Sequence, residues 1–314
     1  MAFKTLKKTL SSLVLAASIA LAPVSSKAAM SPSEEYDYVL KDGKASHIQW
    51  MYGNRAEARA TVLGFDVLFG CLKSGIGSRI NDNGFWKGCA KGALGGAVMY
   101  AGEHVASYNN YPMFGGAGKL VHDLGVSMSD NVMRGDGMFS KYETELGPVT
   151  FTFDEGIMPR LSFTLTPAIA IGHSISNKQS FDAKQSLYNL TPVFKTVLPD
   201  ERFTLNNRLH ATLGSTSANV VSYTPMSEDI DRYVLSHEMN HVLFWSKFRF
   251  SKDLLQWVPT EKAHPSLEME KIQRWWNIGQ DIGGNILYLP MNIDIRAYNY
   301  TMPELEAHSM GNIQ

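Results

Sequence analysis

Residues 237–241, with the sequence His-Glu-Met-Asn-His, form an HExxH pentapeptide, the feature that most constrains the fold of this chain. Two histidines four residues apart lie one turn apart on the same side of an α-helix, so both imidazoles can bind one metal ion. Glu238 points about a quarter-turn away from His237, where it can take a proton from a metal-bound water. The spacing therefore predicts a helix whose side chains are arranged as in a zinc hydrolase.

The residues around the pentapeptide predict that this helix is buried. Ser227 is a suitable N-cap, and the acidic residues after it favour the start of a helix. Apolar side chains then cover most of the circumference, and the polar strip is narrow, consisting of Arg232, Ser236, Asn240 and Lys247. Burying two imidazoles and a carboxylate is costly unless a divalent metal compensates them. The alternative is a pair of structural histidines beside a surface glutamate.

The first 28 residues have the pattern of a secretory signal peptide. Three lysines precede an apolar segment at residues 13–21, and residues 26–28 offer small side chains before a cleavage site. The apolar segment is too short for a membrane span. There is no cysteine near the cleavage site, so a lipoprotein is not predicted. We therefore expect export to the periplasm or the cell envelope, either free or associated with a membrane.

Removal of that segment would leave an acidic chain. The full sequence has 29 basic and 30 acidic residues. Residues 1–28 contain four lysines and no acid, so 25 basic residues remain against 30 acidic ones, a net charge of −5. This balance, without any basic run, argues against a nucleic-acid partner. A hydrophobic content of 44% with 19% charged residues is typical of a globular protein.

Residues 60–107 are rich in glycine, alanine and bulky apolar residues. The pattern predicts two helices, over residues 61–71 and 88–101, joined by a polar turn at residues 81–84. Gly88, Gly92 and Gly96 at four-residue spacing would let the two helix backbones approach closely. Such a hairpin either packs inside a soluble domain or makes a peripheral or re-entrant contact with a membrane.

Both cysteines of the chain, Cys71 and Cys89, lie in this glycine-rich region. In an oxidising compartment they can form a disulfide, whereas in a reducing one they would be two buried thiols. The export signal favours the disulfide.

From about residue 146 the apolar period changes to two. Strands are predicted over residues 149–153, 161–171, 188–198, 202–205 and 218–223, and helices over residues 266–278 and from 302 onward. The fold class is therefore α+β: a Gly-rich helical hairpin, an antiparallel β-sheet and a C-terminal helical part that carries a zincin-like active-site helix. After the signal peptide (1–28), the N-terminal Gly-rich region (29–145) and the sheet-plus-helix region (146–314) are expected to form one continuous globular unit.

A catalytic zinc ion usually has three protein ligands and one water. Phe244 and Lys247 exclude the metzincin pattern HExxHxxGxxH. Residues 304–311, Glu-Leu-Glu-Ala-His-Ser-Met-Gly, resemble the E-x-E-A-D-x-x-G second-helix motif of gluzincin metallopeptidases, notably the integral-membrane prenyl-protease and heat-shock protease group. The resemblance covers the two motif helices, about 35 residues. The upstream region resembles exported proteins of Gram-negative bacteria.

The resemblance implies that His237, His241 and Glu304 bind one zinc ion and that Glu238 is the general base. Glu306 is an alternative ligand. His308 stands where the family carries an aspartate, so it is either a ligand or a hydrogen-bonding neighbour of a ligand, without the negative charge of aspartate.

The same resemblance implies that a peptide or protein substrate pairs with an edge strand before the motif helix, and Asn219, Val220 and Val221 lie in the strand predicted there. An oxyanion donor is also expected, with candidates Tyr298, Tyr300 and His264.

The expected function is that of an exported zinc-dependent metallopeptidase, which hydrolyses peptide bonds with a metal-activated water. The alternative is a non-catalytic structural or assembly protein of the envelope, with a structural or vestigial HExxH site. The Gly-rich helices and the histidine at position 308 motivate that alternative.

Overall fold

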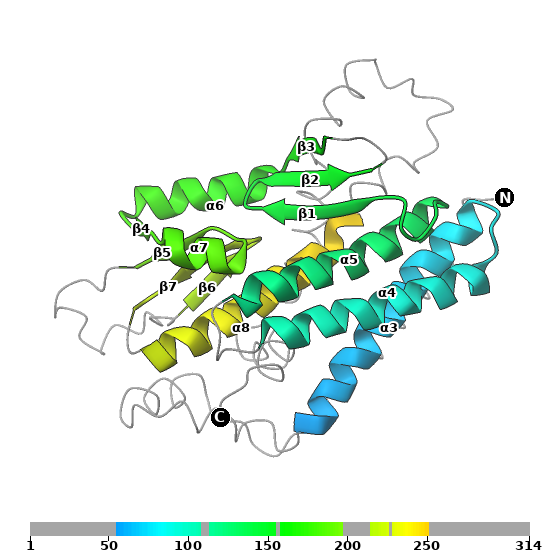
Figure 1. Ribbon diagram of the computed structural model, residues 1–314, viewed down its shortest axis with the longest axis horizontal. Coiled ribbons are helices and arrows are strands. Elements are labelled where there is room, and N and C mark those ends of the chain that lie inside the picture. The colour runs from blue at the N-terminus through cyan, green and yellow to red at the C-terminus, as the bar shows by residue number, and fades with distance from the viewer. Residues whose placement is uncertain (1–54, 108–112, 155–157, 197–213, 226–227, 251–314) are drawn as a thin grey trace.

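The described part of the chain combines a layer of helices with two small β-sheets in a computed structural model (Figure 1). It comprises residues 55–107, 113–154, 158–196, 214–225 and 228–250. Helices and sheets occupy partly separate regions, and one sheet is antiparallel while the other is mixed. The predicted α+β class is therefore confirmed, and the predicted antiparallel sheet is accompanied by a mixed sheet that was not predicted.

Three long helices form the helical layer: α3 (Arg55–Ile80), α4 (Phe85–Ala106) and α5 (Phe114–Arg134). The predicted hairpin corresponds to α3 and α4, which extend beyond the predicted ranges. Glycine allows them to pack closely, because a Cβ atom at Gly92 would overlap the main chain of Gly70. The predicted disulfide is present and joins Cys71 of α3 to Cys89 of α4.

Helix α5 was not predicted from the sequence. It packs against α4 in the same way, because a Cβ atom at Gly125 would overlap the main chain of Met99. The helix ends at Gly135, whose φ of 85° lies in the left-handed region that glycine adopts without steric cost. The Asn131 side chain then donates hydrogen bonds to the carbonyls of Met138 and Lys141, which fixes the turn into the first strand.

The first sheet is an antiparallel meander of β1 (Tyr142–Leu146), β2 (Val149–Phe153) and β3 (Arg160–Phe163). Its first hairpin pairs Leu146 with Val149 across a turn in which Gly147 has a positive φ of 57°. The predicted strand over residues 149–153 is confirmed.

The second sheet has the order β4-β5-β7-β6, formed by β4 (Ser180–Phe181), β5 (Val193–Lys195), β6 (Gly214–Ser217) and β7 (Val220–Tyr223). Strands β5 and β7 are parallel, and the other pairs are antiparallel. Strand β7 therefore lies inside the sheet, and β6 forms an edge among the described strands.

Two predicted strands are partly helical. Residues 161–171 were predicted to continue as one strand, but the strand ends at Phe163 and helix α6 (Leu165–Ser176) follows. The predicted strand over residues 188–198 begins at the end of helix α7 (Ala183–Asn189), and of its described residues, 188–196, those at 193–195 form a strand. The predicted strand over 202–205 and the helices after residue 251 lie outside the described residues.

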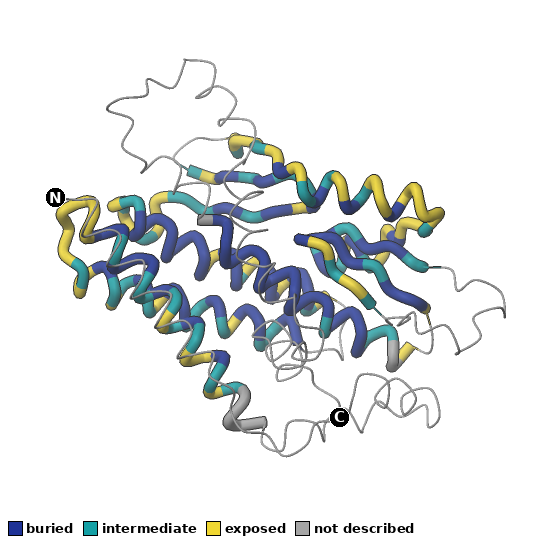
Figure 2. The backbone as a smooth tube through the Cα atoms, turned by 180° about the vertical axis from the view of Figure 1, so that it is seen from behind, coloured by how far each residue is buried: buried dark blue, intermediate teal, exposed yellow. Residues whose placement is uncertain are grey.

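Helix α8 (Glu228–Ser246) carries the HExxH pentapeptide and continues into the 3₁₀ turn η2 (Lys247–Phe250). It contacts α4 and α5 on one side and strands β6 and β7 on the other. Figure 2 shows α8 as mostly buried, and the described residues from Leu243 to Arg249 are all buried. The prediction of a buried motif helix is confirmed.

The second sheet has an apolar core on each face. The core against α8 consists of Val193, Val221, Tyr223, Tyr233, Val234, Leu235, Met239 and Val242. The opposite core, against α6, consists of Ala170, Phe194 and Val220 with Ile171 packed against it. Alternate residues of β7 thus face opposite helices, as expected for a strand buried on both faces.

By length and composition, Arg59–Ile80 is the one described stretch that is long and apolar enough to cross a membrane. It belongs to α3, which packs against α4 and α5. Membrane contact through the Gly-rich helices stays a prediction.

Candidate metal centre

The two histidines of the pentapeptide bring one nitrogen atom each to the same point. The Nε2 atoms of His237 and His241 lie 3.2 Å apart, and the ring centroids are 4.9 Å apart with an interplanar angle of 74°. Two imidazoles on a tetrahedral zinc ion, with bonds of 2.0–2.1 Å, would place their nitrogens about 3.3 Å apart. The pair therefore fits the geometry of two ligands of one zinc ion.

Burial and access differ between the two rings. His241 is 4% exposed, whereas His237 is only half-buried, next to Tyr233 one turn earlier. A site bounded by these two rings has one side protected by the core and one side that is less covered. This is the arrangement that a catalytic metal needs, since substrate or water must reach it.

Glu238 points toward the edge strand β6. Its carboxylate Oε2 accepts a hydrogen bond of 2.6 Å from the Thr216 hydroxyl, which also lies 3.1 Å from the Glu238 main-chain carbonyl. The residue is 6% exposed, so the carboxylate is largely shielded from solvent. A buried ionised carboxylate needs such a donor, because desolvation is otherwise costly.

The opposite side of α8 is fixed to the helical layer by polar contacts. Ser107 lies at the C-terminal end of α4. The Asn240 amide donates a 3.2 Å hydrogen bond to the Ser107 hydroxyl. The Ser236 hydroxyl donates a 3.4 Å hydrogen bond to the Ser107 carbonyl. Asn240 also donates to the Ser236 carbonyl at 2.9 Å. The narrow polar strip predicted on the motif helix is thus a buried seam against α4.

The seam continues beyond the pentapeptide as a network of buried charges. Lys247 Nζ lies 2.5 Å from Asp66 Oδ1 of α3 and 2.7 Å from Glu103 Oε1 of α4, and all three side chains are fully buried. Burial alone would raise the pKa of Glu103, but the Lys247 ammonium and the His122 ring outweigh it and lower that pKa to about 2. Buried ion pairs of Lys247, the residue directly after α8, therefore connect the end of α8 to α3 and α4.

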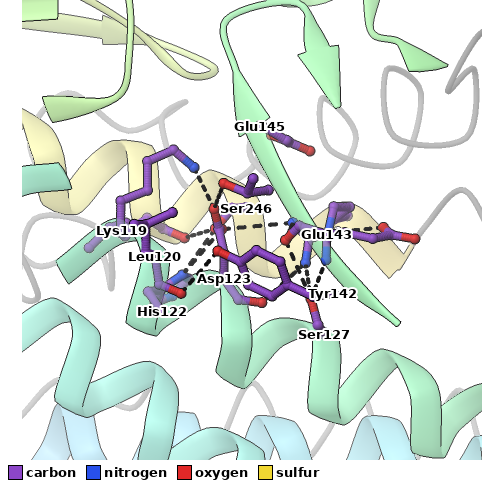
Figure 3. Close-up of polar contacts among 12 residues, drawn as sticks. Lys119, Leu120, His122, Asp123, Ser127, Tyr142, Glu143, Glu145 and Ser246 are labelled. Carbon is purple, nitrogen blue, oxygen red and sulfur yellow. Dashed lines mark hydrogen bonds and ion pairs between the residues drawn. The ribbon is translucent and has the colours of Figure 1, made fainter. Parts of the chain in front are cut away.

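Arg249 extends the network to α5 and to the first sheet. Its guanidinium lies 3.7 Å from Asp123, 3.8 Å from Asp130 and 3.5 Å from Glu143, and it donates a 2.9 Å hydrogen bond to the Glu143 carbonyl. Burial would lower the pKa of Arg249, but these acids raise it above its usual value. Figure 3 shows the part of the network around Asp123 and Glu143.

Lysines complete the network from α3 and α5. Lys119 Nζ lies 2.7 Å from Asp123 Oδ2, and Lys73 Nζ lies 2.7 Å from Asp130 Oδ1. Burial would raise the pKa of Asp123, but the Lys119 ammonium, the His122 ring and the Arg249 guanidinium hold it below its usual range. For Lys73 burial prevails and lowers the pKa despite the attraction of Asp130.

Within this network, three residues have the order of a serine–histidine–acid triad. The Ser246 hydroxyl lies 3.1 Å from His122 Nδ1, and His122 Nε2 lies 3.3 Å from Glu103 Oε1. All three residues are at most 1% exposed, so no substrate can reach the hydroxyl. The arrangement is therefore buried, whereas His237 of the histidine pair is partly exposed.

The predicted substrate strand is wrong in its residues. Val220 and Val221 belong to β7, which pairs with neighbours on both sides and so cannot receive another strand. Asn219 turns toward the first sheet, where its amide donates hydrogen bonds to the Gly147 carbonyl at 2.7 Å and to Glu145 at 3.3 Å. The edge strand before the motif helix is β6.

The predicted third ligand, Glu304, and its alternatives Glu306 and His308 lie outside the described residues, as do His264, Tyr298 and Tyr300. The part of the chain that the structure describes contains no group of three histidine, cysteine or acidic side chains suited to a metal. Of the predicted zinc-site residues, it includes the histidine pair and Glu238.

Sequence reasoning missed Thr216 and the charged partners of the seam. Thr216 sits in a short polar strand that carries no motif. A signal for the seam exists in Lys247 and Arg249, because two basic residues in the otherwise apolar stretch Phe244–Phe250 need partners if the stretch is buried. Comparison of the chain with protein-family models, with curated proteins and with solved structures finds no match in any of the three.

Proposed function

We propose that this chain is an exported zinc-dependent metallopeptidase whose metal is held by His237, His241 and a carboxylate from the C-terminal part of the chain. The observation that carries the proposal is the 3.2 Å distance between the Nε2 atoms of His237 and His241. Glu238, the residue after His237, has its carboxylate held by a hydrogen bond from Thr216 of β6. Two neutral imidazoles and one carboxylate are a ligand set typical of catalytic zinc.

A zinc ion bound there would lower the pKa of a bound water and polarise the carbonyl of the scissile peptide bond. The Glu238 carboxylate would accept a proton from the water that attacks the carbonyl carbon. It would then pass the proton to the amide nitrogen as the carbon–nitrogen bond breaks, so that the products are a carboxylic acid and an amine. The shielded position of Glu238 suits both transfers, because bulk water does not compete for the proton.

The edge position of the short strand β6 supports a peptide as the substrate. It lies at the edge of its sheet among the described strands, directly beside the motif helix. An extended peptide that pairs with β6 would pass in front of Glu238, and main-chain hydrogen bonds would set its register. The substrate strand is thus reassigned from Asn219–Val221 to Gly214–Ser217.

The direct test is the zinc content of the purified mature protein, measured by atomic emission after dialysis. We expect one zinc ion per chain, lost in His237→Ala and in His241→Ala. His173→Ala is the matched control, because His173 is an exposed histidine of α6 that bonds Asn177, and it should keep the metal. If the wild-type protein retains no zinc through dialysis even after stoichiometric zinc has been added, the ligand scheme is contradicted.

Glu304→Ala and Glu306→Ala distinguish the two candidate carboxylates by the same measurement. The variant that lacks the true zinc ligand should bind zinc at least about 10-fold more weakly, while the other variant should keep the wild-type affinity. Equal affinity in both variants would remove the gluzincin scheme.

Turnover is tested with Glu238→Gln on a mixed peptide library read by mass spectrometry. This variant should keep its zinc and lose hydrolysis. Undiminished hydrolysis would exclude Glu238 as the base. Wild-type protein that binds zinc with four protein ligands and hydrolyses no peptide would instead support the non-catalytic envelope role.

A further inference from the structure

Strand β6 presents alternate residues to the motif helix. Gly214 and Thr216 face α8, whereas Ser215 and Ser217 are exposed. The strand is only four residues long and has no bulky side chain. Its contribution to the core is therefore small, and its two inward positions both meet Glu238.

Thr216 fixes one oxygen of the carboxylate. Its hydroxyl lies 2.6 Å from Glu238 Oε2 and 3.1 Å from the Glu238 carbonyl. A short hydrogen bond to an ionised acceptor is stronger than one between neutral groups. The bond occupies Oε2, which leaves Oε1 as the oxygen that can accept a proton.

Gly214 leaves room for that second oxygen. A Cβ atom at position 214 would lie 2.7 Å from Glu238 Oε1 and 2.6 Å from Val234 Cγ1. Both distances are shorter than van der Waals contact, so any other residue would displace the carboxylate or the strand. The glycine is needed here for close approach.

We propose that β6 positions the general base: Thr216 orients the Glu238 carboxylate by hydrogen bonding, and Gly214 leaves room for Oε1 beside the strand. The inference rests on the proposed metallopeptidase function and extends it. The strand that a peptide would pair with is then the strand that holds the base. Substrate register and base orientation would then be set by one element.

The kinetic test compares Thr216→Val with Thr216→Ser in the zinc-loaded mature protein. Valine keeps the shape and removes the donor, so kcat should fall roughly 10- to 100-fold with KM unchanged. Serine keeps the donor and should restore most of the rate. A wild-type kcat in Thr216→Val, or an equal loss in both variants, would overturn the assignment.

Thr144→Val is the matched control for stability. The Thr144 hydroxyl makes a bond of the same kind, 2.7 Å to Asp123 Oδ2, in the buried network. Its removal should lower the unfolding midpoint but leave kcat as in wild type. Gly214→Ala, read in parallel, should retain zinc and lose kcat.

A second readout does not depend on turnover. Crystal structures of Thr216→Val and Thr216→Ser should show the Glu238 carboxylate turned away from β6 in the first and in place in the second. An unchanged carboxylate in Thr216→Val would contradict the positioning role even if no peptide substrate is cleaved. Absence of hydrolysis by wild-type protein, with the carboxylate displaced as expected, would instead count against the proposed function alone.

Discussion

Lys247 Nζ lies 2.7 Å from Glu103 Oε1, and neither side chain has any exposed surface. Lys247 begins the turn that follows the motif helix, whereas Glu103 lies near the end of α4. The pair therefore joins the helix that carries the HExxH residues to the Gly-rich layer. Because the charges are withdrawn from water, each one depends on its partners.

Lys247→Met should destabilise the protein strongly, because Asp66 and Glu103 would keep their charges in a buried space without the ammonium between them. We expect a loss of about 3–5 kcal/mol in the free energy of unfolding, measured by urea denaturation. Arg160→Met is the control: Arg160 pairs with Asp154 at 2.7 Å, but its side chain is 63% exposed. That change should cost less than about 1 kcal/mol.

Stability should fall in acid partly because of Glu103. Its pKa in the folded protein is about 2, below the usual glutamate value of about 4.5, so the unfolded chain binds the proton more tightly. The stabilisation is complete above about pH 4.5 and is lost as the pH falls toward about 2. Glu103→Gln should therefore show a shallower loss of unfolding free energy over this window. Identical slopes in the two proteins would show that Glu103 does not contribute.

Two glycines of the α3–α4 hairpin should respond in opposite ways to alanine. Gly64 has no atom within 4 Å of the position of an added Cβ, so Gly64→Ala should stabilise α3 by up to about 1 kcal/mol. At Gly92 the added carbon would overlap the Gly70 carbonyl and the Ser74 side chain. Gly92→Ala should cost about 1–3 kcal/mol. Thermal unfolding of both variants checks the sign of each change.

Reduction of the Cys71–Cys89 disulfide should lower stability, because the link closes a loop between residues 18 positions apart. For a loop of this length the expected loss is about 3 kcal/mol. Denaturation with and without dithiothreitol measures it. The double variant Cys71→Ala/Cys89→Ala should be insensitive to the reductant, and an equal effect of dithiothreitol on that variant would show that the loss has another source.

The sequence predicted the motif helix well because its signals are local. The histidine spacing, the apolar circumference and the polar strip all depend on one stretch of chain, and a helix brings them together whatever surrounds it. The two cysteines were likewise interpretable, since the predicted hairpin places them on adjacent helices. The third ligand depends on distant residues and could only be argued from resemblance.

Helix α5 was missed because its buried face mixes charged side chains with apolar ones such as Val126 and Val132. Lys119, His122, Asp123 and Asp130 are all buried there, and a hydrophobic pattern cannot identify a face that carries charges. Lys119 and Asp123 pair with each other within the helix, but the other partners come from α3, α4, β1 and η2. Most of the compensation is therefore tertiary, and no local window of the sequence contains it.

Helix α6 was mistaken for a strand because alternating Leu161, Phe163 and Leu165 continue into an apolar run. Short apolar runs fit a strand and a buried helix equally well. The extended Thr164 precedes the helix, and Pro167 lies in its first turn, where a missing N–H is tolerated. These two residues were the available boundary signal.

The charged seam also has a consequence for how this protein could be divided or recombined. Arg249 is neutralised by acids from α5 and β1, on the other side of the sequence boundary expected near residue 145. A fragment that begins at residue 146 would therefore carry the HExxH helix with two orphaned cations in its interior. The motif helix and the Gly-rich helices therefore depend on each other for charge compensation, and neither is expected to fold as a separate module.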